Sequence, residues 1–454
     1  ARRGRRKRGR GARRPAGPRP EVWSTRRAHL VSYVGLFLFT AFVFFRPYEH
    51  LPLPGLAYGA QVLAIFTLAA YFPAQLSAEG NLAARPREVN LALLLLLAAL
   101  LSVPLAVSPA EAWANFVEFG KVVLMFVVLV NVVRTERRLH WLILLSLAAS
   151  VFMSAAAIND YAAGRLGRGG RVKGAIGGLF ENPNDLALHL VTMIPLAVCL
   201  MFGRRGPLKK LAYGLAAALF VAATVVTFSR GGFLGLLAAS AVLGWKLGRK
   251  NRPAVFALGV LAVAAFVIAV PNEYGSRLSS IFGGDATGSA TARQAVLWRS
   301  VVVALRYPIF GVGIGNFHFK SLREQVAHNS YTQVASEMGL AALVVYCLFI
   351  IAPLVRLRAV ERETLGVKEL ARYYYLSVGL QASLAGYMVS SFFASVAHLW
   401  YVYHLVGYAV CLRRLYAVGG GRAASPGGAQ PALTDGPEGA AARPGPRAAG
   451  AGET

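Results

Sequence analysis

Arg230 and His328 are the side chains of this sequence best suited to chemistry, because together they could bind an anion and accept a proton. A guanidinium group binds phosphate oxygens through parallel hydrogen bonds, and an imidazole takes a hydroxyl proton near neutral pH. Each also has a structural explanation: an arginine at a membrane boundary extends its charge into water, and a histidine at a helix start is more often structural. The residue types predict a site for a phosphate-bearing substrate, with the structural explanations open.

A polar stretch at 180–187 precedes one of the apolar segments. Asn182 would be a good N-cap there, and Asp185 is an acid in the first turn, where a helix N-terminus favours one. The loop before it, 164–178, is basic and glycine-rich, which is typical of a lid that contacts an anion. The pattern fits a plain helix start, and it also fits a lid in which Asp185 orders an arginine.

The stretch 291–306 predicts an amphipathic helix on the membrane surface, with Val296 and Trp298 among its apolar residues. A glycine-rich stretch at 308–317 follows it. Because no strand precedes these glycines and no helix with a ribose-binding acid follows them, we interpret them as a tight turn rather than a nucleotide loop.

The elements that must position these residues are apolar segments. The chain has 454 residues, is 56% apolar and carries 48 Lys and Arg against 20 Asp and Glu. A soluble protein with this charge would suggest a nucleic-acid partner, but the apolar residues come in blocks of about 20, the length that crosses a bilayer. The blocks are continuous rather than alternating, which excludes a β-barrel. The sequence therefore predicts an all-α polytopic membrane protein without a nucleic-acid partner.

About twelve transmembrane helices are expected, with eleven as the alternative because the first two segments are short or broken. They run near 29–45, 56–73, 89–107, 112–133, 139–159, 183–202, 208–228, 231–248, 254–271, 333–355, 370–394 and 396–416. The predicted regions are a basic disordered tail (1–27), helices 1–9 (28–271), a large loop with the amphipathic helix (272–332), helices 10–12 (333–416) and a second disordered tail (417–454).

Orientation follows from the positive charges, because Lys and Arg favour cytoplasmic loops. Every short loop on the N-terminal side of the membrane is basic, which predicts that both termini are cytoplasmic. The positive charges left on the outer face gather in the 164–178 loop, at Arg230 and in the large loop, and we expect an anionic partner there. The alternative for the large loop is that long loops cross the membrane regardless of charge.

Glu118 and Lys121 lie three residues apart within the fourth predicted span. They fit a buried compensating pair, and intramembrane ions are also candidates for a functional role.

Taken together, the motifs resemble the O-antigen ligase and polymerase superfamily of bacterial envelope glycosyltransferases. The resemblance rests on ENPNDLA at 181–187, SRGG at 229–232, the Arg293 helix that leads into PIFGVGIGNF at 308–317, and HNSY at 328–331. It implies a multispanning fold and transfer of a glycan from a polyprenyl (undecaprenyl) pyrophosphate carrier to an acceptor hydroxyl, such as that of lipid A-core. It further implies an inner-membrane enzyme of lipopolysaccharide biosynthesis whose active site faces the periplasm.

Matched motif by motif, the resemblance makes His328 the catalytic histidine and Arg230 and Arg293 the pyrophosphate-binding residues. Arg171 and Arg299 are further candidates for pyrophosphate binding on the same face. The candidates for supporting roles are Asn182, Asn184, Asp185, Ser229, Asn329 and Lys121.

No cofactor or metal is expected. The outer-face carboxylates are scattered and form no DxD motif, so arginines would have to stabilise the leaving pyrophosphate. Cys199, Cys347 and Cys411 lie in apolar blocks without CxxC spacing and are expected to be packing residues. Alternatives are a polymerase of the same superfamily, a protein O-glycosyltransferase and, from another class, a lipid-linked glycan transporter, which would need inverted repeats that the sequence does not show.

Overall fold

The structure is a computed structural model of the whole chain. It describes residues 29–420, except 52, 54, 168–170, 173, 175–179, 181, 204–205, 270–287 and 322–323. The predicted tail at 1–27, residues 421–454 of the second tail and residues 272–287 of the predicted large loop lie outside the described residues.

Helices make up nearly all of the described structure. In chain order these are α1 (Leu30–Phe45), α2 (Pro47–His50), η1 (Leu56–Tyr58), α3 (Gly59–Glu79), α4 (Arg87–Ser102), α5 (Pro109–Val132), α6 (Glu136–Ala162), α7 (Pro183–Gly203), α8 (Pro207–Val226), α9 (Arg230–Ala269), α11 (Gly288–Arg306), η2 (Phe317–Lys320), α12 (Ser330–Met338), α13 (Leu340–Thr364), η4 (Lys368–Leu370), α14 (Ala371–Ser390), η5 (Ser391–Phe393), α15 (Trp400–Leu415) and the π-helical turn η6 (Tyr416–Gly420). Strands β1 (Leu166–Gly167) and β2 (Arg171–Val172) form an antiparallel hairpin between α6 and α7.

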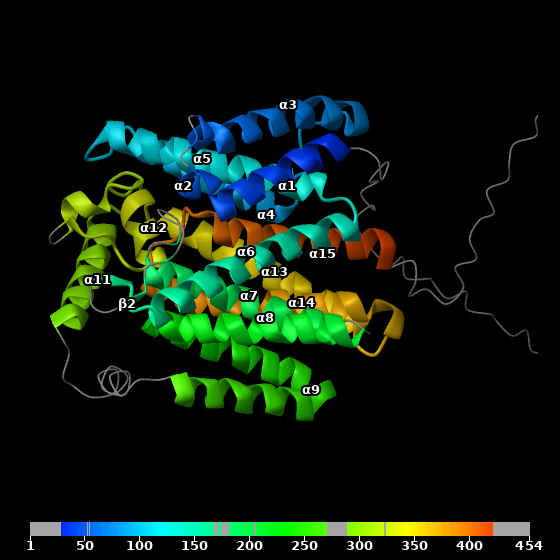
Figure 1. Cartoon of the computed structure of the whole chain (residues 1–454). Helices are drawn as coiled ribbons and strands as arrows, with labels where there is room; N and C mark the ends of the chain where they lie inside the picture. The colour runs from blue at the N-terminus through cyan, green and yellow to red at the C-terminus, as the bar shows by residue number, and fades with distance from the viewer. Residues whose placement is uncertain are drawn as a thin grey trace, which may run out of the picture.

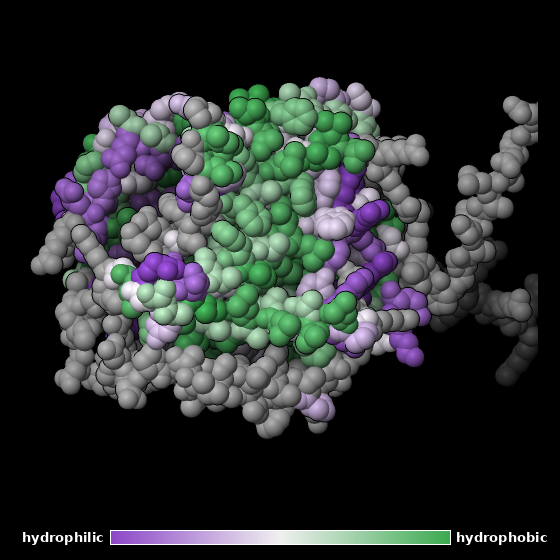
Figure 2. All heavy atoms as spheres, in the orientation of Figure 1, coloured by the Kyte–Doolittle hydropathy of each residue, from purple (hydrophilic) through white to green (hydrophobic). Residues whose placement is uncertain are grey.

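Within the described residues, nine helices are long and apolar enough to cross a membrane. The other three predicted spans correspond to α4 and α15, with 16 residues each, and to the second part of α9. Figure 2 shows apolar side chains over the middle of the visible face and hydrophilic ones toward both ends. The prediction of an all-α polytopic membrane fold is confirmed.

α7 is the central helix of the bundle. In its most apolar stretch 83% of the residues are buried, as expected for a helix that is apolar on every side, and it packs against α8, α9 and α14. It begins at Pro183 beside the β hairpin and ends at Gly203. We call the end of the bundle that carries the β hairpin, α11 and α12 the α11 end (Figure 1); α7 starts there and runs to the opposite end.

The predicted amphipathic helix is present as α11, which lies across the ends of the spanning helices (Figure 1). Val296 and Val303 face the protein and are 1% and 3% exposed, whereas Trp298 and Leu305 are 65% and 66% exposed. One face of α11 therefore packs on the protein and the other presents apolar side chains outward.

Two helix boundaries differ from the prediction. The predicted tenth span at 333–355 is two helices, because Gly339 has φ 93° and ψ 170° and separates α12 from α13. The predicted eighth and ninth spans form one continuous helix, α9, with Pro253 inside it, and Figure 1 shows the two parts of α9 folded side by side. Hydrogen bonding within α9 continues through the basic stretch at 249–252 that suggested a loop.

Candidate functional site

The candidate site is built at the α11 end from the β hairpin, the starts of α7, α9 and α12, and α11 (Figure 1). The hairpin between α8 and α9 is the first part. Phe228 has a positive φ of 51°, which turns the chain sharply. The Ser229 hydroxyl accepts a hydrogen bond from the Gly232 N–H (3.1 Å) and donates one to Asn184 Oδ1 (2.9 Å). Ser229 thus caps α9 and ties its start, where Arg230 stands, to the start of α7.

Close packing requires glycine at this junction. A Cβ atom at Gly232 would lie 2.6 Å from the Ala187 Cβ, and one at Gly231 would lie 2.6 Å from the Phe393 Cβ. The SRGG motif therefore sets how closely α9 approaches α7 and the segment after α14.

Arg171, on β2, links the same two helices. Its Nε donates to the Thr227 carbonyl oxygen (3.0 Å) and its guanidinium donates to Asn184 Oδ1 (2.9 Å). Arg171 therefore holds the β hairpin against the α8–α9 turn, and its contact with a pyrophosphate stays a prediction.

The start of α7 has the predicted cap. Asn182 Oδ1 accepts a hydrogen bond from the Asn184 N–H (2.9 Å), and Pro183 is the first helical residue. Among the described residues Arg171 bonds Asn184 and Arg165 bonds Asp160. The prediction that Asp185 orders an arginine of the loop gains no support from these contacts.

His328, Arg293 and Arg230 come from three segments, and Arg293 lies close enough to each of the other two for their charges to interact. Burial lowers the pKa of His328, and the positive charge of Arg293 lowers it further. Partial burial also lowers the pKa of Arg293, with a second contribution from the charge of Arg230. The lowered pKa favours the neutral imidazole, the form that accepts a proton, and Arg293 is the guanidinium group whose charge acts on it.

A small separate core fixes the distance between Arg293 and His328. Val296 and Val303 of α11 pack against Val312, Phe317 and Ala327. Ala327 directly precedes His328, so this core holds the helix that carries Arg293 against the segment that carries the histidine.

The start of α12 is fixed by its own polar residues. Asn329 Oδ1 accepts hydrogen bonds from the Tyr331 and Thr332 N–H groups (2.9 and 3.0 Å), which makes Asn329 an N-cap. The Ser330 hydroxyl donates to the Ala394 carbonyl oxygen (2.7 Å) and accepts from the Val396 N–H (3.0 Å). His328 itself has a positive φ of 50°, held by these contacts.

The glycine-rich segment is the predicted tight turn, and it packs on the end of α12. Gly313 donates its N–H to the Glu337 carbonyl oxygen (3.0 Å). Gly311, Gly313 and Gly315 all have positive φ, and a Cβ atom at Gly311 would lie 2.3 Å from the Glu337 carbonyl carbon. The turn thus connects α11 to α12 through backbone contacts that leave no room for side chains.

Sequence reasoning gave Glu337 no role, yet its carboxyl group holds this turn. The side chain is 4% exposed, and its Oε2 accepts a hydrogen bond from the Gly315 N–H (3.0 Å). Burial raises its pKa to about 8, against an opposing effect of hydrogen bonds from the Gly315 and Phe317 backbone and from Gln333. The sequence feature that could have indicated this role is an acidic residue placed two positions before a glycine within an apolar stretch.

Arg299 and Lys121 lie apart from this arrangement. Arg299 donates to the Lys320 carbonyl oxygen (2.7 Å) and thereby joins α11 to η2. Lys121 forms the predicted ion pair with Glu118 (2.6 Å), but their side chains are 41% and 71% exposed, so the interpretation as a buried pair is wrong. Facing outward from α5, the two charges compensate each other at the protein surface.

The described residues contain no group of three His, Cys, Asp or Glu side chains placed to hold a metal ion. Cys199, Cys347 and Cys411 are free, as expected from their spacing.

Comparison with known proteins is informative for one region. No curated protein matches the chain. Residues 215–347 match the family model described as O-antigen ligase, and this stretch carries Arg230, Arg293 and His328 but not Arg171 or Lys121. The match confirms the resemblance predicted from the motifs, over residues 215–347 of the chain.

Proposed function

We propose that the protein transfers a glycan from a polyprenyl pyrophosphate carrier to an acceptor hydroxyl, as an O-antigen ligase-like glycosyltransferase without a metal ion. The observation that carries the proposal is the convergence of Arg230, Arg293 and His328 from α9, α11 and the start of α12. All three lie in the region that matches the O-antigen ligase family.

The proposed step forms one bond and breaks another. The acceptor oxygen attacks the anomeric carbon of the glycan while the bond from that carbon to the pyrophosphate oxygen breaks. His328 takes the hydroxyl proton, and Arg230 and Arg293 stabilise the charge that develops on the pyrophosphate. The lowered pKa of His328 suits this role, because the imidazole is neutral before the acceptor arrives.

The proposed site faces the periplasm, with both termini in the cytoplasm of a cell whose inner membrane holds the protein. The support is the charge pattern: every short loop at the opposite end of the bundle is basic, as expected for cytoplasmic loops. A site on the outer side uses a lipid-linked donor and needs no nucleotide sugar.

The experiment is transfer in proteoliposomes supplied with a polyprenyl-pyrophosphate glycan and a lipid A-core acceptor, without ATP. We expect product from the wild type and a loss of about 10²–10⁴ in rate for His328→Ala, the usual contribution of a general base. Arg293→Ala should also lose activity, whereas Arg306→Ala, an exposed arginine on the same helix, should not.

Each outcome has a clear reading when folding is monitored by size-exclusion chromatography. Full activity in folded His328→Ala would remove the histidine from the mechanism. Transport of the donor across the bilayer without product would favour a transporter. Product made only when the acceptor is a second lipid-linked glycan would favour the polymerase, and product on a protein hydroxyl would favour a protein glycosyltransferase.

A further inference from the structure

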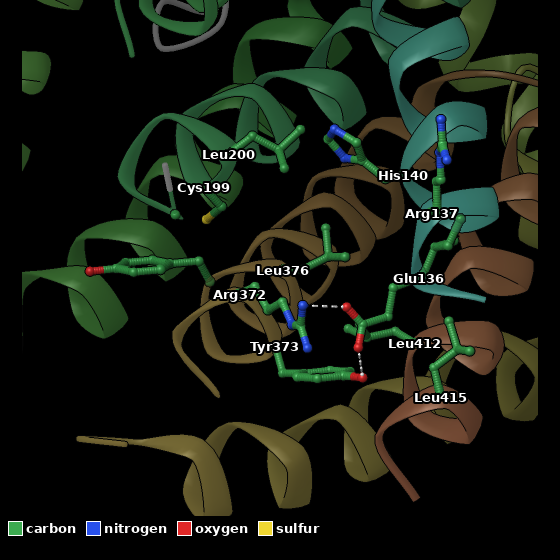
Figure 3. A pocket seen from close by; sticks show the side chains of 13 residues that line it. Glu136, Arg137, His140, Cys199, Leu200, Arg372, Tyr373, Leu376, Leu412 and Leu415 are labelled. Carbon is green, nitrogen blue, oxygen red and sulfur yellow. Dashed lines mark hydrogen bonds and ion pairs between the residues drawn. The ribbon is translucent and has the colours of Figure 1, made fainter. Parts of the chain in front are cut away.

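A cavity of about 400 Å³ (Figure 3) is lined by the end of α7 that lies away from the candidate site. α7 connects the two places and, with 21 residues, is about 30 Å long. The cavity lies where α6 begins, α7 ends, α14 begins and α15 ends. Spanning helices end where hydrocarbon meets water, so the cavity is at the depth of lipid headgroups.

The cavity has an apolar wall and a polar mouth. Leu139, Leu200 and Leu376 are part of the wall. Arg137 of α6 and Arg372 of α14 lie on different sides of it (Figure 3). This division, one apolar and one cationic surface, matches a molecule that has an acyl chain and an anionic group.

The cationic groups at the mouth are not fully neutralised by the protein. Arg372 pairs with Glu136 (2.7 Å), which also accepts a hydrogen bond from the Tyr373 hydroxyl. Arg137 is exposed, and no acceptor among the described residues bonds it. The cavity thus has two arginines at its mouth, and the Glu136 carboxylate pairs with only one of them, Arg372.

Three other arginines at this end differ from Arg137, because each has a protein acceptor. Arg134 pairs with Glu79 (2.7 Å) and Arg413 with Glu88 (2.9 Å). Arg138 donates to a backbone carbonyl oxygen, that of Val132 (3.0 Å). Arg137 therefore brings to the cavity a positive charge that has no such acceptor among the described residues.

We propose that this cavity binds one anionic phospholipid, with its phosphate between Arg137 and Arg372 and the upper part of an acyl chain along Leu139, Leu200 and Leu376. The rest of the chain extends into the surrounding bilayer, since the cavity opens where the helices end. A soluble anion would use the arginines but leave the apolar wall exposed to water. Each Lys or Arg near a membrane surface attracts anionic lipid by about 1 kcal/mol. The proposed binding of phospholipid in this cavity does not depend on the proposed transfer reaction.

The test is native mass spectrometry of the full chain, released from mixed micelles that contain equal amounts of phosphatidylglycerol and phosphatidylcholine. We expect one retained phosphatidylglycerol in preference to phosphatidylcholine. Arg137→Gln should lower the retained ratio of the two lipids about fivefold, the weight of one such cation. Arg358→Gln removes an exposed arginine near the same end of the bundle, from α13, and should leave the ratio unchanged.

A second variant keeps every charge and fills the cavity. A Cβ atom at Gly203 would lie 3.7 Å from the Tyr375 ring, an ordinary contact, so Gly203→Leu should fold and reduce retention of phosphatidylglycerol. Equal retention of both lipids by the wild type would overturn the proposal. So would a ratio for Arg137→Gln equal to that for Arg358→Gln, or undiminished retention by folded Gly203→Leu.

Discussion

Glu337 makes the stability of the protein depend on pH, and the dependence follows from its burial. The carboxyl group is 4% exposed, and its pKa is raised from 4.5 to about 8. The folded protein therefore keeps a proton that the unfolded chain releases above pH 4.5. For a group with a raised folded pKa, the stabilisation is complete below the unfolded pKa and is lost as pH rises through the folded one. Alkaline conditions should loosen the contact with the glycine-rich turn.

The size of the effect follows from the two pKa values. At pH values between the unfolded and the folded pKa, the free energy of unfolding falls by about 1.4 kcal/mol for each pH unit. Between pH 6 and pH 9 the loss at this one group is about 2–3 kcal/mol, which lowers the melting temperature by a few degrees. Glu337→Gln keeps an oxygen that can accept the hydrogen bond from the Gly315 N–H, and its side chain does not titrate. The free energy of unfolding of this variant should therefore fall much less between pH 6 and pH 9.

The assay is thermal unfolding of the purified protein in detergent at pH 6, 7.5 and 9. The melting temperature of the wild type should fall more steeply with pH than that of Glu337→Gln. Glu369→Gln, which removes an exposed carboxyl group, serves as the control and should follow the wild type. Parallel curves for the wild type and Glu337→Gln would refute the reasoning, as would a Gln variant that is already unfolded at pH 6.

Three further predictions concern the same end of the bundle. Gly339→Ala should lower the melting temperature by several degrees, because the residue has φ 93° and the added Cβ would lie 2.1 Å from the Ile309 carbonyl oxygen. Gly248→Ala, whose added Cβ would lie in open space, should leave the melting temperature unchanged. Equal melting temperatures for the two variants would contradict the strain assigned to Gly339. Asn329→Ala should lower the free energy of unfolding by about 1 kcal/mol because it removes the N-cap of α12, whereas Asn329→Ser keeps a capping oxygen and should lose less. Thermal unfolding measures the difference, and equal stabilities of the two variants would argue against the cap. The rate of glycan transfer should be unchanged by EDTA, since arginines are proposed to stabilise the pyrophosphate; activity lost to EDTA and restored by Mg²⁺ would contradict a metal-independent mechanism.

The features that depend on local sequence could be predicted. Apolar block length gave the spanning helices, the order Asn182-Pro183 gave the start of α7, and the spacing of glycines in 308–317 gave a turn. The opposite faces of Val296 and Trp298 could also have been deduced, because residues two apart on a helix point about 200° apart.

The features that depend on partners far away in the sequence could not be predicted. The helix break at Gly339 lies against the Ile309 carbonyl oxygen, 30 residues earlier in the chain. Because the sequence is apolar on the C-terminal side of Gly339 and partly apolar before it, the hydropathy pattern does not indicate a break. The role of Glu337 depends on the Gly315 N–H, 22 residues away. The outward position of Lys121 depends on which side of α5 its neighbours cover, and hydropathy does not report that.

The two hydrogen bonds of the Ser330 hydroxyl, to Ala394 and Val396, affect when the protein becomes competent during synthesis. A nascent polypeptide that already contains the whole 215–347 region still lacks both anchoring groups, which are translated some 60 residues after Ser330. The start of α12, next to His328, would lack these two bonds until the ribosome has passed residue 396 and α14 has entered the membrane. A truncated gene product ending before that point should insert into the bilayer and yet remain inert.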